Sequence, residues 1–376
     1  MSGSCILCGK CLSVCPLIKA TNREELGPRA KADLCRLLED GTIPLSEKNA
    51  GELASMCLGC RRCTNVCSQG VDVPGLVAAL RSEHPGFKGW LWKTWLTNAA
   101  VLWSASSSAA NHLPDSLKPE RFGPFLKMLA GLKGESGLRP AVIPASFPDS
   151  YKGKKMLLFA GCTANYVQGR WLMAALRLLD GLGVEVIPGD FKCCGGSLKS
   201  AGFADEAASM QEHNLDVWRS AGKPDVVTFC TSCRAALRAY PCNDKAEQEE
   251  WGAAQHPLSE LTREIEFSVS IDDSVRFGYH RPCHVGKADA DGVLMRAALG
   301  SRLVVSGEEQ CCGFGGVMHL AAPDVCAQVN TQCWDSFGET DVIVTGCAAC
   351  AARLASSAPE GKRAGHWLEL IGEPVI

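Results

Sequence analysis

A short apolar strand that ends in a Cys-x-x-Cys motif occurs twice in this chain, as DVVTFCTSC at residues 225–233 and as DVIVTGCAAC at residues 341–350. Each occurrence is preceded by a Cys-Cys-Gly triplet and, further upstream, by a single cysteine. The two sets of cysteines are Cys162, Cys193, Cys194, Cys230 and Cys233, and Cys283, Cys311, Cys312, Cys347 and Cys350. Two unrelated stretches would hardly agree at five cysteines and a strand, so the last part of the chain is predicted to be an internal duplication.

Each copy alternates short apolar runs, typical of buried strands, with amphipathic helical patterns. Strands are expected at 155–160, 184–187 and 226–229 in the first copy, and at 276–279, 303–305 and 342–345 in the second. Helices are expected at 171–182, from about 196 to 220 and from 230 onward in the first copy, and at 294–299 and 327–334 in the second. This alternation predicts βαβ units and a short parallel sheet in each copy. The ten cysteines then lie just past strands or at helix starts, where open α/β sheets bind ligands and helix N-termini stabilise anions.

The N-terminal part contains two runs of four cysteines with the ferredoxin spacing C-x2-C-x2-C-x3-C. The runs are Cys5, Cys8, Cys11 and Cys15, followed by Pro16, and Cys57, Cys60, Cys63 and Cys67, followed by Ser68 where proline is usual. In two-cluster ferredoxins the fourth cysteine of each run binds the other cluster. We therefore predict two cubane 4Fe-4S clusters, one held by Cys5, Cys8, Cys11 and Cys67, the other by Cys57, Cys60, Cys63 and Cys15. Zinc, the alternative metal, prefers two spaced pairs of ligands.

Residues outside these motifs allow two interpretations. Arg29 and Lys31 lie on an expected helix between the two runs, where they would either approach a cluster and raise its reduction potential or face solvent. The four remaining cysteines are interpreted as small buried apolar residues, the common state of free cysteine. They are Cys35, Cys242, Cys326 and Cys333.

Composition excludes several classes of protein. Of 376 residues, 46% are hydrophobic and 21% charged, which is a globular mixture and not a disordered one. The formal net charge is −3 and no run of lysine and arginine reaches five residues, so nucleic acid is not an expected partner. The 22 cysteines do not indicate a disulfide scaffold, because the first cysteine motif begins at residue 5 and leaves no room for a signal peptide. We expect a cytoplasmic protein, either free or peripheral on the inner face of the membrane.

Residues 86–150 hold no cysteine and are rich in tryptophan and proline, which predicts a helical linker. If residues 90–103 form one helix, Trp92, Trp95, Leu96, Ala99 and Trp103 share a face. That face would pack on the protein's own core, or it would dock on a membrane surface or a membrane subunit.

The whole pattern resembles a known architecture, a two-cluster ferredoxin domain followed by two CCG (cysteine-rich) domains. It is similar to the D-type subunit of heterodisulfide reductase and to the iron–sulfur subunits of glycolate oxidase and of anaerobic glycerol-3-phosphate dehydrogenase. The stretches YHRPCHVGK (279–287), CCGFGG (311–316) and HWLEL (366–370) also resemble these families. The distribution of cysteines along the chain puts domain boundaries near residues 85 and 150. Together with the resemblance it predicts an α+β fold: a helical ferredoxin-like domain at 1–85, a helical linker at 86–150, and α/β CCG domains with short parallel sheets at 151–265 and 272–376.

The resemblance also implies a cofactor set. Complete CCG motifs in heterodisulfide reductases resemble ligand sets for noncubane 4Fe-4S clusters, which bind and cleave a disulfide one electron at a time. One or two such clusters are expected here, held by the two sets of five cysteines. Relatives of the glycolate oxidase type often lack one cysteine of each Cys-x-x-Cys, whereas this sequence lacks none.

Two functions follow from the resemblance. The first is an electron-transfer subunit of an anaerobic-type oxidoreductase that is active only in complex. It would link a flavoprotein dehydrogenase or reductase to quinone or another carrier. A quinone-linked membrane subunit would be a further partner. The second is a catalytic subunit that reduces a disulfide. Only the second copy has histidines flanking its first cysteine, His280 and His284. They are candidate catalytic proton donors, or they only hydrogen-bond backbone carbonyls.

Overall fold

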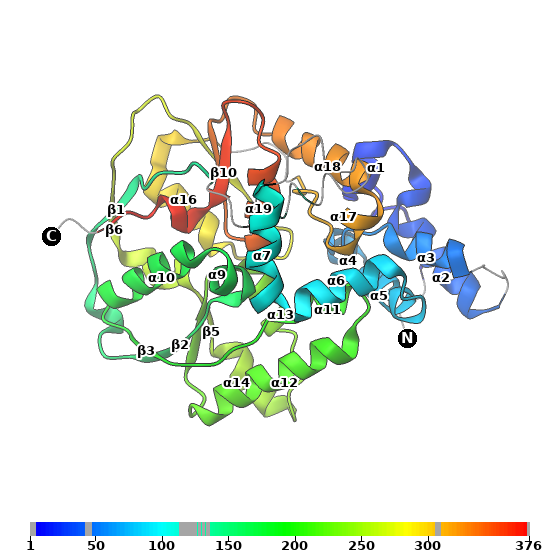
Figure 1. Ribbon diagram of the computed structural model, residues 1–376, viewed down its shortest axis with the longest axis horizontal. Helices are drawn as coiled ribbons and strands as arrows, with labels where there is room; N and C mark the ends of the chain where they lie inside the picture. The colour runs from blue at the N-terminus through cyan, green and yellow to red at the C-terminus, as the bar shows by residue number, and fades with distance from the viewer. Residues whose placement is uncertain are drawn as a thin grey trace.

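The computed structural model describes residues 5–41, 47–112, 126, 129, 132, 136–304 and 310–373. Figure 1 shows the N-terminal helices on one side of the molecule and the two sheet-containing copies on the other. The described N-terminal part is helical, as the sequence predicts, and prolines begin several of its helices, where their missing N–H costs nothing. Its helices are α1 (Pro16–Thr21), η1 (Glu24–Leu26), α2 (Pro28–Glu39), α3 (Glu47–Ser55), α4 (Arg62–Val66) and α5 (Val73–Glu83).

The two copies contain the same four-stranded parallel sheet. The first sheet has the order β3-β2-β4-β5 and the second the order β10-β9-β7-β8, so each strand of one sheet has a counterpart in the other. The first comprises β2 (Lys155–Phe159), β3 (Glu185–Ile187), β4 (Asp225–Thr228) and β5 (Gln255–Pro257); the second comprises β7 (Phe277–His280), β8 (Leu303–Val304), β9 (Val342–Thr345) and β10 (Arg363–His366). The predicted parallel sheets are confirmed, and the last strand of each sheet was not foreseen.

Helices cover both sheets and follow the strands in the expected alternation. In the first copy they are α9 (Gly161–Tyr166), α10 (Gly169–Gly181), α11 (Gly196–Ser200), α12 (Ala204–Ser220), α13 (Thr231–Leu237), α14 (Lys245–Ala253), α15 (Leu258–Leu261) and η4 (Thr262–Glu264). In the second they are α16 (Ala290–Leu299), η5 (Gly300–Arg302), α17 (Val317–Ala321), α18 (Pro323–Asp335), α19 (Ala348–Ser356) and η6 (Trp367–Leu370).

The single helix expected from about 196 to 220 is wrong, because the chain breaks between α11 and α12. Gly202 lies in this break with φ +92°, a left-handed conformation that glycine adopts readily. A Cβ at Gly202 would lie 2.6 Å from the backbone nitrogen of Ser82 in α5. The break therefore lets the first copy approach the N-terminal helices closely.

One side chain, Arg81 of α5, joins the same two parts of the molecule. It is buried and donates hydrogen bonds to the carbonyls of Ala54 (2.8 Å), Cys57 (2.9 Å) and Ser200 (2.5 Å). On the other side, α1 packs against α18 and α3 against α17, so the N-terminal part also contacts the second copy.

The segment expected to be a helical linker is only partly helical. Strand β1 (Val142–Ser146) pairs antiparallel with β6 (Glu266–Val269), which joins the end of the linker to the stretch between the two copies. Val142 also forms a bridge to Ile371 near the C-terminus. The largest hydrophobic core contains side chains of both copies, including Phe159 and Phe277. The two copies thus share one core.

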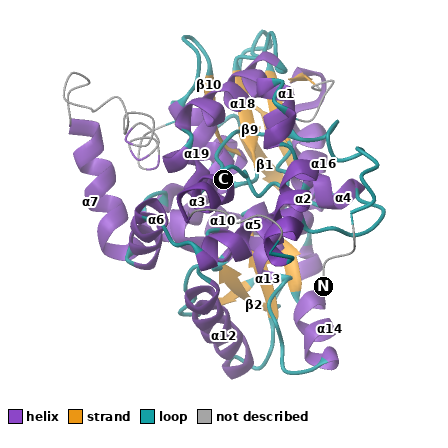
Figure 2. Ribbon diagram, turned by 90° about the vertical axis from the view of Figure 1, so that its right-hand side faces the viewer, coloured by secondary structure: helices purple, strands orange, loops and turns teal. Residues whose placement is uncertain are grey.

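The predicted helix at 90–103 is two helices, α6 (Phe87–Thr97) and α7 (Ala99–His112), separated at Asn98. The five residues predicted to share a face are nevertheless all buried, in a core that also contains Leu198 and Val317. The rings of Trp95 and Trp103 stack with their centroids 4.5 Å apart. This face therefore packs on the protein itself, while Figure 2 shows α7 standing at the margin of the molecule. None of the described helices is both long and apolar enough to cross a bilayer.

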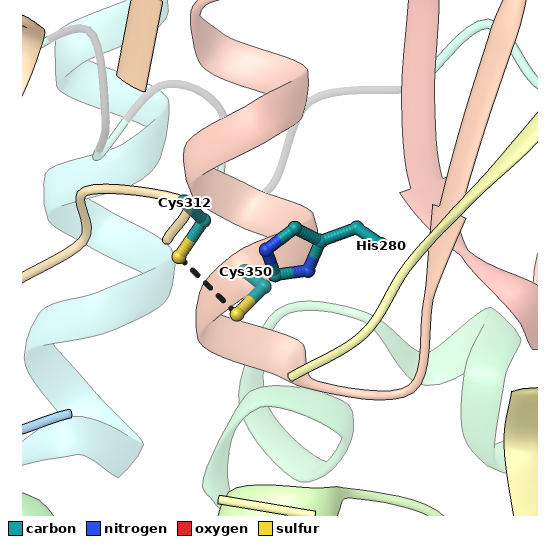
Figure 3. Close-up of side chains that lie close together, drawn as sticks. All are labelled: His280, Cys312 and Cys350. Atoms are coloured by element: carbon teal, nitrogen blue, oxygen red, sulfur yellow. Dashed lines mark hydrogen bonds between the residues drawn. The ribbon is translucent and has the colours of Figure 1, made fainter. Parts of the chain in front are cut away.

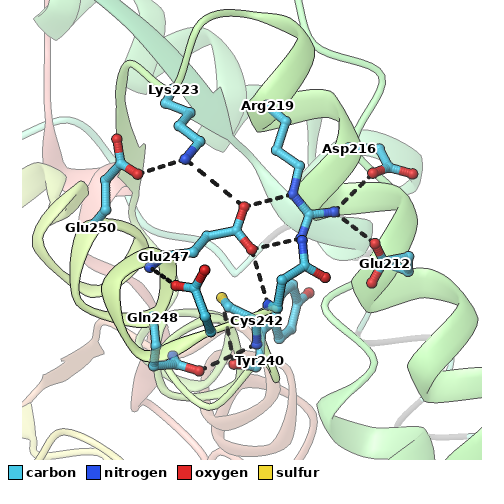
Figure 4. Close-up of polar contacts among 11 residues, drawn as sticks. Glu212, Asp216, Arg219, Lys223, Tyr240, Cys242, Glu247, Gln248 and Glu250 are labelled. Carbon is cyan, nitrogen blue, oxygen red and sulfur yellow. Dashed lines mark hydrogen bonds and ion pairs between the residues drawn. The ribbon is translucent and has the colours of Figure 1, made fainter.

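A polar network fastens α14 to α12 in the first copy (Figure 4). Arg219 donates two hydrogen bonds to the carboxylate of Glu247, at 2.8 and 2.9 Å, and also pairs with Glu212 and Asp216. The hydrogen bonds from Arg219, followed by one from the backbone of Asn243, lower the pKa of Glu247 to about 2. The second copy has no described counterpart of α14, because α19 leads directly into β10.

Candidate iron–sulfur sites

The two ferredoxin runs fold so that each fourth cysteine meets the other run. The pKa of Cys11 is raised by burial and by the neighbouring thiolates of Cys5, Cys8 and Cys67. In the same way, burial raises the pKa of Cys63 to about 12, with Cys57 and Cys15 as neighbouring thiolates. A cavity lies among the second group, lined by Cys15, Cys57, Cys60 and Cys63. The structure thus brings together the two groups of four expected from the sequence, and their role as ligands stays a prediction.

A buried cation faces the second of these groups. Lys31 is only 2% exposed, lines the same cavity and donates a hydrogen bond to the carbonyl of Leu26. Burial lowers the pKa of Lys31, and the thiolates of Cys57, Cys15 and Cys63 oppose that shift. Arg29, in contrast, lies near the surface and pairs with Glu24 at 3.1 Å. Of the two cations considered from the sequence, Lys31 is therefore the one placed to stabilise an anionic cluster.

The five cysteines of the first copy converge at the carboxyl end of its sheet. The sulfurs of Cys193 and Cys162 are 3.8 Å apart, and thiol contacts continue from Cys193 to Cys194, Cys233 and Cys230. Gly161 has φ +77°, and a Cβ there would lie 3.2 Å from the sulfur of Cys233. This glycine therefore lets the backbone pass close to the thiols.

Two side chains, Asn214 of α12 and Tyr240 in the loop after α13, hold the Cys-Cys backbone of the first copy. The amide of Asn214 donates to the carbonyl of Cys193 at 3.2 Å, and its oxygen accepts from the backbone N–H of Lys192 at 2.8 Å. The hydroxyl of Tyr240 donates to the carbonyl of Cys194 at 3.0 Å. These buried polar residues carry no sequence motif, which is why sequence reasoning missed them.

Four cysteines of the second copy make the same chain of thiol contacts, and Cys283 lies beside them as a thiolate neighbour of Cys311 and Cys312. The sulfurs of Cys312 and Cys350 are 3.2 Å apart (Figure 3), Cys350 contacts Cys347, and Cys312 contacts Cys311. The amide of Asn330 donates to the carbonyl of Cys312 at 2.9 Å, as Asn214 does in the first copy. The arrangement of thiols and backbone is therefore repeated with its support.

The two sets of five meet at their Cys-x-x-Cys motifs. The thiol of Cys230 contacts Cys347, and the hydroxyl of Ser232 lies 3.3 Å from the sulfur of Cys230 and 3.4 Å from that of Cys347. The backbone N–H of Thr231 donates to the carbonyl of Gly346 at 2.8 Å.

A buried carboxyl, Asp291 of α16, lies at this junction. It accepts a hydrogen bond from the hydroxyl of Thr231 at 3.2 Å, and burial raises its pKa to about 7. A Cβ at Gly346 would lie 1.7 Å from one of its oxygens, so only glycine fits there. The contact joins the two copies through groups that no spacing in the sequence indicated.

The second copy also adjoins the ferredoxin part. Burial raises the pKa of Cys283, and the thiolates of Cys60 and Cys312 raise it further. Arg62 donates to the carbonyl of Gln310 at 3.1 Å, and the ring of His284 donates to the backbone of Gly59. The sulfur sets therefore follow one another in space: the exposed set containing Cys5 and Cys8, the second ferredoxin set, the second copy and the first copy.

The two candidate histidines occupy different positions in the second copy. His280 is 2% exposed, and its Nδ1 lies 3.3 Å from the hydroxyl of Thr345. His284 is half-buried, and its Nδ1 lies 3.4 Å from the sulfur of Cys283. Burial lowers the pKa of both rings. Both lie beside the thiols, as expected, but only His284 is partly accessible.

The donor chemistry fits iron–sulfur clusters. All eighteen motif cysteines are free thiols, and they gather in four groups of four or five. Thiolates are the usual ligands of such clusters. Of the cysteines outside the motifs, Cys35, Cys326 and Cys333 are buried, which confirms the expectation for these three, and Cys242 is partly exposed.

Comparison with known proteins gives matches over the same regions. Residues 1–71 match the model of a 4Fe-4S dicluster domain, and residues 156–238 and 277–355 match the cysteine-rich CCG domain. The chain is 24% identical over 405 residues to the glycolate oxidase iron-sulfur subunit of Escherichia coli (strain K12), with 98% of this chain and 93% of that protein covered.

Two further relatives span most of the chain. The D-type subunit of the dihydromethanophenazine:CoB–CoM heterodisulfide reductase of Methanosarcina acetivorans is 25% identical over 387 residues, covering 93% of this chain and 88% of that protein. The probable glycolate oxidase iron-sulfur subunit of Bacillus subtilis (strain 168) is 24% identical over 369 residues, covering 87% and 82%. The resemblance inferred from the motifs is confirmed for these two kinds of oxidoreductase subunit.

Proposed function

We propose that this chain, an oxidoreductase subunit with a 4Fe-4S dicluster domain and two CCG domains, carries electrons between a flavoprotein partner and quinone or another carrier. Clusters held by the four thiol sets would supply one-electron transfer. The observation that supports this function is the unbroken spatial order of the sets, from the exposed Cys5 and Cys8 to the first CCG domain. A chain of closely spaced sets suits transfer across the molecule.

Each ferredoxin set would hold a cubane cluster and each CCG set a noncubane one. For these sets the chain supplies eighteen thiols, the buried Lys31 beside the second set, and the asparagines that fix the Cys-Cys carbonyls. The anaerobically prepared protein should then contain about sixteen iron atoms, four for each cluster. An iron content near eight, or zinc in the CCG domains, would contradict this cofactor set.

A second candidate function is reduction of a disulfide at the CCG domains, as in the heterodisulfide reductases. The observation that favours it is that both Cys-x-x-Cys motifs are complete and adjoin each other through Cys230 and Cys347. Disulfide or quinone reduction consumes protons, and a histidine is suited to deliver them near neutral pH. We assign this role to the histidines flanking Cys283, with His284 as the proton donor because His280 is enclosed.

One experiment separates the two functions. The loaded protein is reduced with a dye under anaerobic conditions and then mixed with a quinone in one arm and a small thiol disulfide in the other. Reoxidation by quinone, followed by re-reduction of the chain when a flavoprotein partner and its substrate are added, supports electron transfer. Rapid reoxidation by the disulfide alone, without a partner, supports disulfide reduction, and reoxidation by neither would contradict both.

A separate experiment on whole cells tests location. We propose a cytoplasmic protein that associates with a quinone-linked membrane subunit through surface contacts. Cell fractionation should find the chain at the membrane when that subunit is present and in the soluble fraction when its gene is deleted. Membrane association that persists after the deletion would contradict this proposal.

A further inference from the structure

Equivalent positions in the two CCG domains carry different side chains next to the sulfurs. Phe159 ends β2 and pairs with Thr228 of β4, while His280 ends β7 and pairs with Thr345 of β9. Both residues precede the first cysteine of their set by the same interval in the sequence. The strand register therefore makes Phe159 and His280 counterparts, and the second domain has a ring nitrogen where the first has carbon.

His280 points into the sulfur set of the second domain (Figure 3). One of its ring nitrogens and the sulfurs of Cys312 and Cys350 all lie within 4.8 Å of one another. Its Nε2 is buried and forms no hydrogen bond of ordinary distance and angle among the described residues, while the backbone of Gln310 lies close enough to the ring to raise its pKa against the lowering by burial. A buried nitrogen without a partner is costly, so a native structure of this kind calls for a ligand at that atom.

The other ring nitrogen is already engaged. Nδ1 lies 3.3 Å from the hydroxyl of Thr345, which is fully buried. When Nδ1–H donates to that oxygen, Nε2 keeps its lone pair and faces Cys312 and Cys350. Metal-binding histidines usually have this arrangement, with the second nitrogen held by a hydrogen bond that fixes the tautomer and the ring orientation.

We propose that Nε2 of His280 is a sixth donor to the cluster of the second CCG domain and binds one of its irons. The inference rests on the proposed function only in requiring that this domain hold an iron–sulfur cluster. The first domain, with Phe159 at the same position, would hold its cluster by cysteine alone. Histidine ligation raises the reduction potential of iron–sulfur centres relative to all-cysteine ligation. The second domain would therefore be the more easily reduced of the two.

The test uses the full chain loaded with ⁵⁷Fe and labelled with ¹⁵N-histidine. Mössbauer spectra detect every iron whatever its spin state, and pulsed electron paramagnetic resonance of the reduced protein detects nitrogen bound to iron. The wild type should show one distinct iron subsite and a strongly coupled histidine nitrogen. Their absence from the wild type would overturn the proposal without any variant being made.

Three variants locate the nitrogen. His280→Phe introduces the residue that the first domain already carries at this register, and it should remove the coupling and lower the midpoint potential of the second domain. Thr345→Val should weaken iron retention in this domain by roughly 10–100-fold, as loss of a hydrogen bond behind a metal ligand typically does. His284→Ala should leave the coupling unchanged.

The outcomes of these experiments can be told apart from a failure of the proposed function. Coupling that survives His280→Phe, or vanishes in His284→Ala, would overturn the assignment to His280. An all-cysteine cluster with normal electron transfer would overturn this inference and leave the proposed function standing. Iron loss from all four sets in His280→Phe would show that this variant misfolds. The spectra of the wild type would then decide whether a histidine nitrogen binds iron.

Discussion

The two CCG domains share a strand order, five thiols and an asparagine that holds the Cys-Cys backbone, but their sulfurs have different neighbours. The second domain adds His280, where the first has Phe159, and the buried cation Arg353, where the first has Ala236. Only the second adjoins the ferredoxin part through the thiol of Cys60. The duplication has thus retained the means of holding a cluster and changed the charge and the neighbours around it.

The prediction with the largest expected effect concerns the order of the two domains along the electron path. The double variant Cys312→Ala/Cys350→Ala and its counterpart Cys194→Ala/Cys233→Ala should each lose about four irons of sixteen. With electrons supplied at the ferredoxin end, the first variant should leave the first domain unreduced, because the second domain lies between. Stopped-flow absorption would show this, with the counterpart variant as the control whose second domain is still reduced.

The next effect concerns proton delivery, which we assign to the second domain alone. His284→Ala should lower turnover of a disulfide or quinone by roughly 10²-fold or more, the usual scale for a missing general acid. The matched change Thr163→Ala, at the residue following Cys162, should leave turnover unchanged. Steady-state rates with a reduced dye measure both, and equal losses in the two variants would remove the distinction between the domains.

A smaller effect is expected from the buried cation. Burial lowers the pKa of Arg353, and the thiolates of Cys326 and Cys312 oppose that shift, so its charge acts on the second sulfur set. Arg353→Met should lower the midpoint potential of that domain by roughly 50–100 mV, a charge effect on the order of 1–2 kcal/mol.

Arg234 of the first domain provides the matched control for this change. It is also partly buried, but the charged groups facing it are Arg238, Glu260 and Asp291, and not the thiols. Redox titration of Arg234→Met should therefore show little change in either domain. A shift as large as that of Arg353→Met would indicate a general effect of losing a buried cation.

The smallest effect is on the stability of the first domain, which alone has α14. Glu247→Gln should lower the free energy of unfolding by roughly 1 kcal/mol, whereas Glu249→Gln, on the exposed side of the same helix, should not. Because the pKa of Glu247 is lowered from 4.5 to about 2, this contribution is present above about pH 4.5 and is lost as the pH falls toward 2. Denaturant unfolding at pH 7 and pH 3 would measure it, and unchanged potentials in Glu247→Gln would show that the effect is structural.

Much of this architecture could be predicted from the sequence because its signals are local. The run at 342–345 is a strand as expected, and the structure places Cys67 near Cys11 and Cys15 near Cys63, as the ferredoxin spacing predicts. The pairing of β1 with β6 could not be foreseen, because neither strand indicates its partner in the sequence. The break at Asn98 lies inside an unbroken apolar periodicity, so the pattern gave no sign of it.

The same reasoning explains what was missed at the site. The nearness of His280 to Cys312 and Cys350 depends on the register of β7 against β9, which joins residues 65 apart in the sequence. The contact of Cys230 with Cys347 depends on how the two domains pack, to which Thr231, Gly346 and Asp291 contribute. Motif spacing identifies the members of each sulfur set but gives neither their neighbours nor the order of the sets.

The position of Arg81 has a consequence for how electrons move. One buried guanidinium binds carbonyls on both sides of the boundary between the ferredoxin part and the first CCG domain, and the second domain is joined to both by its own contacts. The sulfur sets are therefore held at fixed separations, and no tethered domain has to swing between a donor and an acceptor. Internal transfer should then proceed at the same rate in buffer and in concentrated glycerol, because solvent friction has no domain motion to slow.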